Sequence, residues 1–411
     1  MIMSIPVFLL FSIYGVVSTY LPLFLRTMGY SASNIGFLLA VFEISGVVIP
    51  FVVSPLISKK GIYGLFLLAS GLLMVILPYP LLKTSGFSLT AGILALYAAG
   101  FKGIVPVSDS LINRLLGEKR AEYGRVRVMG SIGFVVMSLI LQYVARLETA
   151  DTDAILLWMV FPPLLFSLSI ILIPGLLKRY RDDEKESVIP YTNSKGLKPV
   201  QAAVDKKERL SVRIKAVIKE FPSIYWAGMF LIFSGFLGLI PANKFFSLYV
   251  YEYLGMEASG LLWALAAAAE IPFMFFSSRF LRRFGSMKLI VFGTFTIFLR
   301  VITYILIPNF TGAVIGQLFN SITYGLYHPA AVSFAAQYAP KNKLVVSMTL
   351  YSVVATGLAN IAGNCLGGII IDAAGYPMLF IMFSSFPLFA VLVYLFYSKT
   401  VLKKRKRMGL H

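Results

Sequence analysis

The sequence predicts an all-α membrane protein in which twelve transmembrane helices form two pseudo-symmetric six-helix bundles. Of its 411 residues, 58% are hydrophobic and only 13% are charged, and the mean hydropathy is +0.82. Soluble domains carry about 25% charged residues, so an ordinary soluble enzyme is excluded. Apolar runs of the ~20 residues that a membrane helix needs recur along the whole chain. One long polar stretch divides these runs into two sets of six.

Each apolar segment is long enough to cross the hydrocarbon core of a bilayer. The first starts close to Met1 without a basic leader or a small-residue cleavage site, so we expect it to be retained as a span. Proline and glycine interrupt several segments, which neighbouring helices or water can compensate. The expected spans are 3–25, 34–57, 62–82, 87–113, 126–145, 155–177, 222–249, 257–278, 287–307, 311–338, 344–371 and 376–397.

The distribution of basic residues predicts the orientation. Of the 37 lysines and arginines, 31 fall on the side of the even-numbered loops and the C-terminus. The opposite side has four, which are Arg26, Lys83, Arg146 and Lys244. Basic loops remain cytoplasmic, so both termini are expected in the cytoplasm of a multi-pass protein of the cell (inner) membrane.

A polar stretch separates the two halves, which resemble each other weakly. The segment at 30–44 resembles that at 256–271, and each is followed by a basic turn with glycine. This internal similarity predicts a six-helix bundle over 1–177, a cytoplasmic basic linker over 178–220, a second bundle over 221–398 and a basic cytoplasmic tail over 399–411. Such duplication favours a substrate site between the bundles, near the midplane. The alternative is a coincidental match between two apolar helices.

The composition excludes several other functions. The net charge of +19 suggests a nucleic-acid binder, but the basic residues follow the cytoplasmic loops, so no nucleic-acid partner is expected. One cysteine and two distant histidines exclude a disulfide framework and a His or Cys metal site. No cofactor is implied. A membrane enzyme would need clustered acids, histidines or metal ligands at an interface, and none is found, so the protein is expected not to be an enzyme.

Ionisable residues inside spans are costly and therefore mark functional sites. Lys102 and Asp109 lie seven residues apart in the fourth span, on nearly the same helix face. Arg127, at the start of the next span, can pair with Asp109 or offer a polar ligand its planar donors. We therefore expect Asp109, Arg127 and Lys102 to bind substrate. Alternatively, Arg127 is a cytoplasmic anchor and Asp109 is hydrated.

Two glutamates occupy similar places in the two halves, Glu43 and Glu270. Low dielectric disfavours a charged carboxyl group, so either one could bind and release a proton. Arg300, in the otherwise apolar ninth span, needs a counter-charge or water, and Glu270 on the preceding helix is the expected partner. The alternative for both glutamates is a neutral side chain satisfied by the helical backbone.

The remaining candidates are weaker. His328 could relay protons, although a histidine beside Pro329 is more often structural. Trp263 and Tyr20 fall on helices that would line the cavity, and aromatic faces suit sugars, nucleobases and phenyl rings equally. Asp372, near a span end, is expected to be a solvated cap. The small residues in 130–133 and 362–368, which include Cys365, permit close helix approach.

Several segments resemble the major facilitator superfamily. The pattern Tyr/Phe-Gly-Arg-x-Arg-x-x-Gly-x-x-Gly at 123–133, together with the stretch 20–40, is similar to the branch of lactose-permease-like sugar symporters, nucleoside–proton symporters and phenylpropionate permeases. In the lactose permease type the second arginine pairs with an acid eighteen residues earlier to bind sugar. Eighteen residues before Arg127 is Asp109, so the resemblance implies this pair as the substrate site.

The second half follows the branch less closely. The resemblance implies that Arg300 corresponds to the arginine of a proton site, and Glu270 matches its acid with a shift of about one turn. The tenth-helix His and Glu of that site have no counterparts in 318–324. The loop signature Gly-x-Leu-x-Asp-x-x-Gly is degraded at 54–61, where the acid is lost. The fifth span lacks the Gly-Pro motif of drug–proton antiporters, which favours uptake.

These observations predict a proton-coupled secondary transporter that takes up a small polar or aromatic solute by alternating access. A sugar, a nucleoside and an aromatic acid remain open as substrates. Asp109 and Arg127 would bind the solute, and Glu270, tuned by Arg300, would carry the proton, with Glu43 and His328 as further candidates. The expected partners are the solute, protons and the lipid bilayer, and the default state is a monomer. The alternatives are an exporter of drugs or metabolites and a non-transporting sensor or scaffold.

Overall fold

The computed structural model describes residues 2–84, 86–117, 123–147, 152–180, 220–340 and 343–407. Nearly all of the expected linker, over 181–219, and the last four residues of the expected tail lie outside the described ranges.

The first half of the chain, up to residue 172, is a set of helices. Apolar residues run through each, with some buried against neighbouring helices and others exposed on the outer surface. Leu77 separates α3 from α4, which begins at Pro78, within one pass of the chain. The helices are α1 (Ser4–Thr27), α2 (Ala32–Lys60), α3 (Tyr63–Ile76), α4 (Pro78–Lys83), α5 (Phe87–Leu116), α6 (Tyr123–Ile140), the π-helix η2 (Leu141–Ala145) and α7 (Thr152–Leu172).

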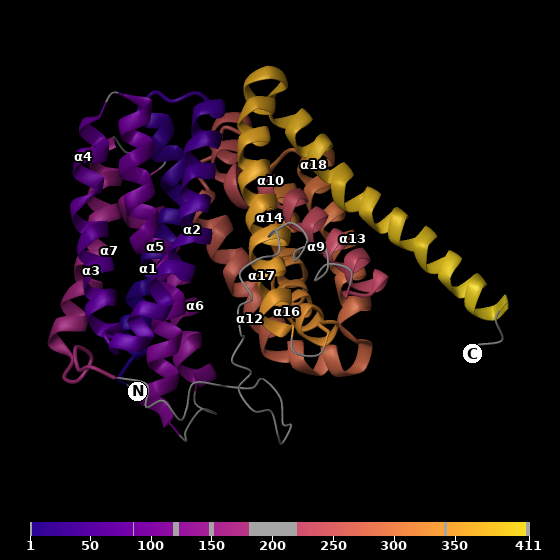
Figure 1. Cartoon of the computed structure of the whole chain (residues 1–411). Coiled ribbons are helices and arrows are strands. Elements are labelled where there is room, and N and C mark those ends of the chain that lie inside the picture. Colours follow the sequence, from indigo (N-terminus) through magenta and orange to yellow (C-terminus); the bar gives the residue numbers. More distant parts are fainter. Residues whose placement is uncertain are drawn as a thin grey trace.

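The second half is also helical but more often interrupted. Its elements are α9 (Ser223–Gly238), α10 (Ile240–Lys244), α11 (Phe246–Leu248), the π-helix η3 (Tyr249–Tyr253), α12 (Ser259–Phe284), α13 (Ser286–Leu306), α14 (Phe310–Leu318), α15 (Asn320–Thr323), α16 (Tyr327–Gln337), α17 (Leu344–Thr349), the π-helix η4 (Leu350–Leu358) and α18 (Ala359–Arg407). Gly375, with φ 75°, breaks α18 into two arms that run in opposite directions, as Figure 1 shows.

The helices form two groups that lie side by side (Figure 1). In the first group α1 packs on α6 and α7, and α5 packs on α2 and α3, while in the second α18 packs on α9 and α13. The groups touch mainly where α2 meets α18 and where α6 meets α12. The first contact joins the second pass to the eleventh, and the second contact joins the fifth pass to the eighth. If the second and fifth passes correspond to the eighth and eleventh, six passes later, each contact is the counterpart of the other. This is the arrangement that an internal duplication would give.

Breaks in the helices explain how the observed passes differ from the expected spans. Within the described ranges, nine helical stretches are long and apolar enough to cross a membrane, and one of them, Leu344–Thr400, joins the last two expected spans. The expected spans 222–249 and 311–338 are discontinuous. Pro241 is the second residue of α10 and cannot donate a backbone hydrogen bond. Broken helices of this kind are tolerated inside membrane proteins where protein or water satisfies the backbone.

Small residues bring helices close together at both stretches for which this was expected, 130–133 and 362–368. A Cβ on Gly368 would lie 2.1 Å from the carbonyl oxygen of Ala32, and one on Gly36 would lie 2.3 Å from that of Asn364. These glycines therefore permit the approach of α2 and α18 between the two halves. Gly133 similarly admits the backbone of Phe8, at 2.2 Å, where α6 crosses α1. The prediction that 130–133 and 362–368 permit close packing is confirmed.

Candidate substrate and coupling site

The first part of the site is the pair of Asp109 and Arg127, on α5 and α6. The distance from Arg127 Nε to Asp109 Oδ1 is 4.0 Å, and each side chain is 32% exposed. The hydroxyl of Tyr123 interacts with both charged groups, and the guanidinium carbon of Arg127 lies 4.0 Å from the centre of the Phe11 ring. The sequence placed these two residues on neighbouring helices, and the structure brings them together. Their loose, half-exposed pairing leaves hydrogen-bonding capacity on both side chains for a polar ligand.

The second part of the site links Glu270 to Arg300 through an amide. Arg300 is fully buried, and it donates to Asn320 Oδ1 at 2.8 Å, to Thr323 Oγ1 at 2.9 Å and to Gln317 Oε1 at 2.8 Å. Asn320 Nδ2 in turn donates to Glu270 Oε2 at 3.2 Å. The expected direct pairing of Arg300 with Glu270 is thus wrong, because neutral side chains of α14 and α15 occupy the donor positions of the guanidinium. Asn320 connects the two charges instead.

The two parts of the site interact across the boundary between the halves. Glu270, on α12, is within electrostatic range of Arg127 on α6, and Tyr324 is within range of both. Tyr324 lies between α15 and α16, near the middle of the expected span 311–338, and it is 40% exposed. A carboxylate of the second half therefore interacts electrostatically with an arginine of the first. Together with Asp109 these groups can bind a polar solute from two sides.

A third cluster of charges joins α2, α5 and α10. Lys102 Nζ donates to both carboxylate oxygens of Glu43 at 2.8 Å, and Lys244 Nζ donates to Oε1 at 2.6 Å. Assigning Lys244 to a loop on the non-basic side is therefore wrong. Because α10 follows the break after α9, Lys244 reaches a glutamate of the other half. Lys102 therefore pairs with Glu43 and not with Asp109. The seven residues between Lys102 and Asp109 correspond to about 10 Å along α5 at the rise of an α-helix.

The other expected site residues have mostly structural contacts. His328 Nδ1 lies 3.0 Å from the hydroxyl of Tyr351, and its ring stacks on Tyr324 with the ring centres 5.3 Å apart. Trp263 donates its indole N–H to Ser247 Oγ at 3.2 Å and is half-buried. Tyr20 is fully buried, where α1 meets α12. In this conformation Tyr20 is not accessible to a solute.

Several polar contacts connect the halves at one end of the molecule. We call it the upper end, because it lies at the top of Figure 1, where α18 reverses direction. Glu252 of η3 accepts from Arg26 of α1 at 3.0 Å and from the hydroxyl of Tyr376 at 2.6 Å. The Asp372 carboxylate accepts from the backbone N–H groups of Ala32 at 3.0 Å and Ser33 at 2.7 Å. Asp372 is therefore an exposed cap, as expected, but it caps a helix of the other half.

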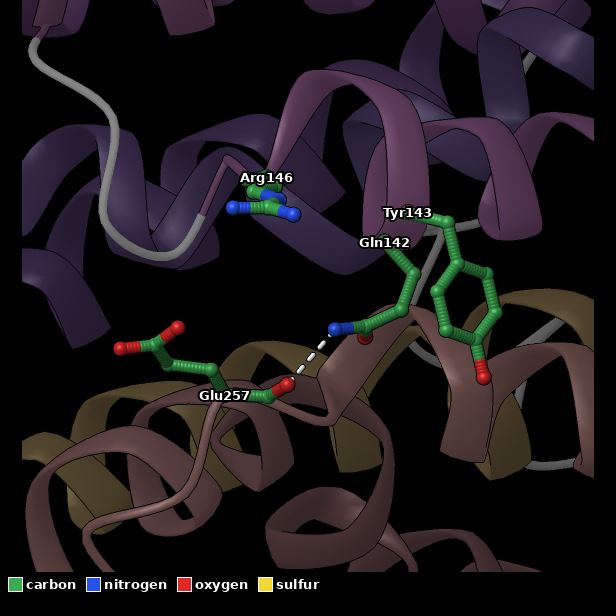
Figure 2. A pocket seen from close by; sticks show the side chains of 4 residues that line it. All are labelled: Gln142, Tyr143, Arg146 and Glu257. Atoms are coloured by element: carbon green, nitrogen blue, oxygen red, sulfur yellow. Dashed lines mark hydrogen bonds between the residues drawn. The ribbon is translucent and has the colours of Figure 1, made fainter.

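A small pocket lies between the halves at the same end. Its volume is about 240 Å³, and it is lined by Gln142, Tyr143 and Arg146 from the first half and Glu257 from the second. Figure 2 shows Gln142 pointing across to the Glu257 backbone, to which its amide donates at 2.6 Å. The Gln142 side-chain oxygen also accepts from the backbone N–H of Leu261 at 3.1 Å. Gln142 thus binds the start of α12 from the other half.

Sequence reasoning missed several residues of these clusters. Lys244 is an ionisable residue within the apolar segment 222–249, and the rule that selected Lys102 would also have selected it. Asn320, Gln317 and Thr323 gave no signal, because neutral polar residues occur in many membrane helices. The stretch 318–324 lacks the charged residues of the lactose permease type, and here it supplies the amide that contacts both Glu270 and Arg300.

Two groups of helices with ionisable residues between them are typical of membrane transporters. The chain belongs to the MFS_1 like family, whose model matches residues 1–382. It is thus a multi-pass membrane transporter of the major facilitator superfamily, and the expected membership is confirmed.

Curated relatives of the chain are transporters. The chain is 26% identical over 305 residues to a maltose permease of Geobacillus stearothermophilus, covering 74% of this chain and 70% of that protein. It is 22% identical over 383 residues to the putative nucleoside transporter YegT of Escherichia coli K12, covering 90% of this chain and 84% of that one.

Solved structures of the same fold are also transporters. A point mutant of the nucleoside transporter NupG matches with a TM-score of 0.77 at 13% identity, over 96% of this chain and 98% of that chain. A POT family transporter in complex with a thioalcohol-conjugated peptide matches with a TM-score of 0.68 at 13% identity, over 97% and 96%. At such identities the likeness concerns the fold alone.

Proposed function

We propose that this protein takes up a small polar or aromatic solute together with a proton, by alternating access in the cell (inner) membrane. The solute is a sugar, a nucleoside or an aromatic acid. The transporting unit is a monomer of two bundles, 1–177 and 221–398, joined by a cytoplasmic linker over 178–220 and followed by a basic cytoplasmic tail over 399–411. Both termini are cytoplasmic, so the upper end faces outward.

The observation that carries this proposal is the position of Glu270. Its carboxylate accepts from Asn320, which also binds the buried Arg300, and it lies within electrostatic range of Arg127 in the other half. A proton on Glu270 therefore changes the field at Arg127 and its partner Asp109, where we place the solute. Proton and solute then influence each other's binding, as coupled transport requires.

The roles follow from these contacts. Asp109 and Arg127 bind the polar groups of the solute, with Lys102 adding selectivity and Trp263 and Tyr20 adding aromatic surface in the conformation that exposes them. Glu270, tuned by Arg300 through Asn320, carries the proton. Glu43 and His328 are further proton-binding candidates.

The upper-end contacts support alternating access. The polar bonds of Arg26, Asp372 and Gln142 to the other half all lie at this end. A conformation held together at its outer end is the inward-facing state of such a cycle. Transport requires that these contacts break, and each ligand shifts the equilibrium by its difference in affinity for the two states.

The test is solute-dependent proton movement. Purified protein is reconstituted into proteoliposomes with a pH-sensitive dye, and sugars, nucleosides and aromatic acids are added in turn. We expect external alkalinisation with one class, and its loss in Asp109→Asn with unchanged folding. Normal transport by Asp109→Asn would reject the assigned role.

An exporter of the same fold that works by proton antiport would acidify the exterior, because the added solute would enter the vesicle in exchange for an internal proton. A sensor or scaffold would give no solute flux with any class. The missing Gly-Pro motif of the fifth span favours uptake over export.

A further inference from the structure

The cluster of Lys102, Lys244 and Glu43 carries an unbalanced charge. We call the two ammonium groups the lysine pair. In the described part of the chain Glu43 is the sole carboxylate that forms an ion pair with either lysine. Two cations around one anion leave one positive charge in the interior of the bundle. Uncompensated charge within a membrane domain costs several kcal/mol, so this arrangement indicates that a second anion binds there.

The cluster is partly exposed. The side chains of Lys102 and Lys244 are 21% and 24% exposed, and that of Glu43 is 12% exposed. Each ammonium group has three donors, and Lys244 uses one of them on Glu43. A solute can therefore reach donors that remain on the lysine pair.

The first half holds Lys102 in a fixed position. Its aliphatic stem lies against Gly46, where a Cβ would be 3.0 Å from the Lys102 Cδ and Cγ atoms. Its Nζ lies 5.0 Å from the centre of the Phe42 ring, an attractive cation–π contact. Lys244, by contrast, is on the five-residue helix α10 that follows the break at Leu239. Interrupted helices in transporters place substrate-binding groups at this depth.

We propose that the lysine pair binds the carboxylate of an organic monoanion, with Glu43 as the internal anion that this carboxylate partly displaces. The inference rests on the proposed transport function and requires that the solute, whichever of the three bodies it has, carries a carboxylate. A monoanion brings the cluster to neutrality, whereas a dianion such as a phosphate monoester leaves one excess negative charge. Because Lys102 and Lys244 belong to different halves, the bound carboxylate also connects them.

The probes are three matched pairs with the same body, one member neutral and one a carboxylate. They are glucose and glucuronate, uridine and orotidine, and 3-phenylpropionamide and 3-phenylpropionate. Binding to the purified full-length protein is measured by ligand-induced thermal stabilisation. We expect one acid to bind at least ten times more tightly than its neutral counterpart. In Lys244→Met and Lys102→Met this preference falls to about onefold, while Lys244→Arg retains it.

Two further variants make the test specific. Lys83→Met removes an exposed lysine of α4 that is outside the cluster, and it should leave the preference unchanged. Glu43→Gln removes the internal anion, so it should tighten binding of the acid on the order of tenfold, corresponding to about 1.4 kcal/mol. A cluster that only holds the halves together predicts no such gain.

The inference is overturned if neutral members bind as well as the acids, if the preference survives both Lys→Met substitutions, or if no acid binds. Tighter binding that fails to appear in a folded Glu43→Gln variant also contradicts it. The proposed transport function has a separate criterion, which is solute-dependent proton movement. A neutral solute that drives such movement would leave transport standing and reject the carboxylate site.

Discussion

Replacing Asp372 by alanine should open the upper end of the protein. The Asp372 carboxylate accepts from the backbone N–H groups of Ala32 and Ser33, at the start of α2 in the other half. Loss of such a cap typically costs ~1 kcal/mol. Because Asp372 is exposed, water can bind the two N–H groups once the carboxylate is removed. We therefore use ~1 kcal/mol for the loss of the cap and add no helix-dipole contribution. Because the contact exists only while the halves meet at this end, the substitution destabilises that conformation selectively.

The expected change is a shift between conformations. A loss of ~1 kcal/mol raises the ratio of molecules open at the upper end to those closed there about fivefold. Electron–electron distance measurements between two spin labels report this ratio. Ser88 on α5 and Thr311 on α14 are exposed, lie near the upper ends of their helices in different halves, and suit labelling after Cys365→Ala.

The matched control is Asp153→Ala. Asp153 is an exposed acid in the first turn of α7, at the same end of the molecule. We expect it to leave the distance distribution as in the unsubstituted protein. If Asp372→Ala gives the same distribution as Asp153→Ala, then the cap does not hold the halves together, and the reasoning that links the upper-end contacts to alternating access is refuted.

Three further predictions follow from the site and the packing. Glu270→Gln should abolish proton-driven accumulation but retain solute exchange across proteoliposomes, and accumulation that persists would remove Glu270 from the proton role. Arg300→Met leaves three buried acceptors without their charged donor, so it should cost ~3 kcal/mol of stability. The loss is measured as a lower melting temperature. The control Arg279→Met replaces an exposed arginine and should not lower the melting temperature. Gly368→Ala places a Cβ 2.1 Å from a carbonyl oxygen of α2, so it should increase the distance between the spin labels as Asp372→Ala does. The control Gly86→Ala places its Cβ in open space and should leave that distance unchanged.

The sequence was sufficient to predict the fold because that prediction rests on local properties, above all the length of each apolar segment. Apolar length identifies a membrane helix whatever surrounds it. The failures were at breaks within passes. Lys244 was counted with the basic residues of the non-basic side although it falls within the expected span 222–249, and the break before α10 brings it to Glu43 of the other half.

Part of the site was predictable for the same reason. Asp109 and Arg127 are close because their helices are consecutive, and burial alone makes each a candidate. The partners of Arg300 were not predictable, since a guanidinium can donate to several neutral oxygens that converge on it instead of to a carboxylate. Contacts between the halves, such as that of Asp372 with α2, depend on the packing of residues about 340 positions apart, which no local pattern encodes.

The pocket lined by Gln142, Tyr143, Arg146 and Glu257 has a pharmacological consequence. It is formed by both halves, so it exists as a unit in the conformation in which they meet at this end. In the proposed orientation, a membrane-impermeant compound added from outside that filled it would lock the proposed transport cycle at that stage without competing directly for the solute site. Inhibition of that kind would lower the maximal rate of uptake, and more solute would not relieve it.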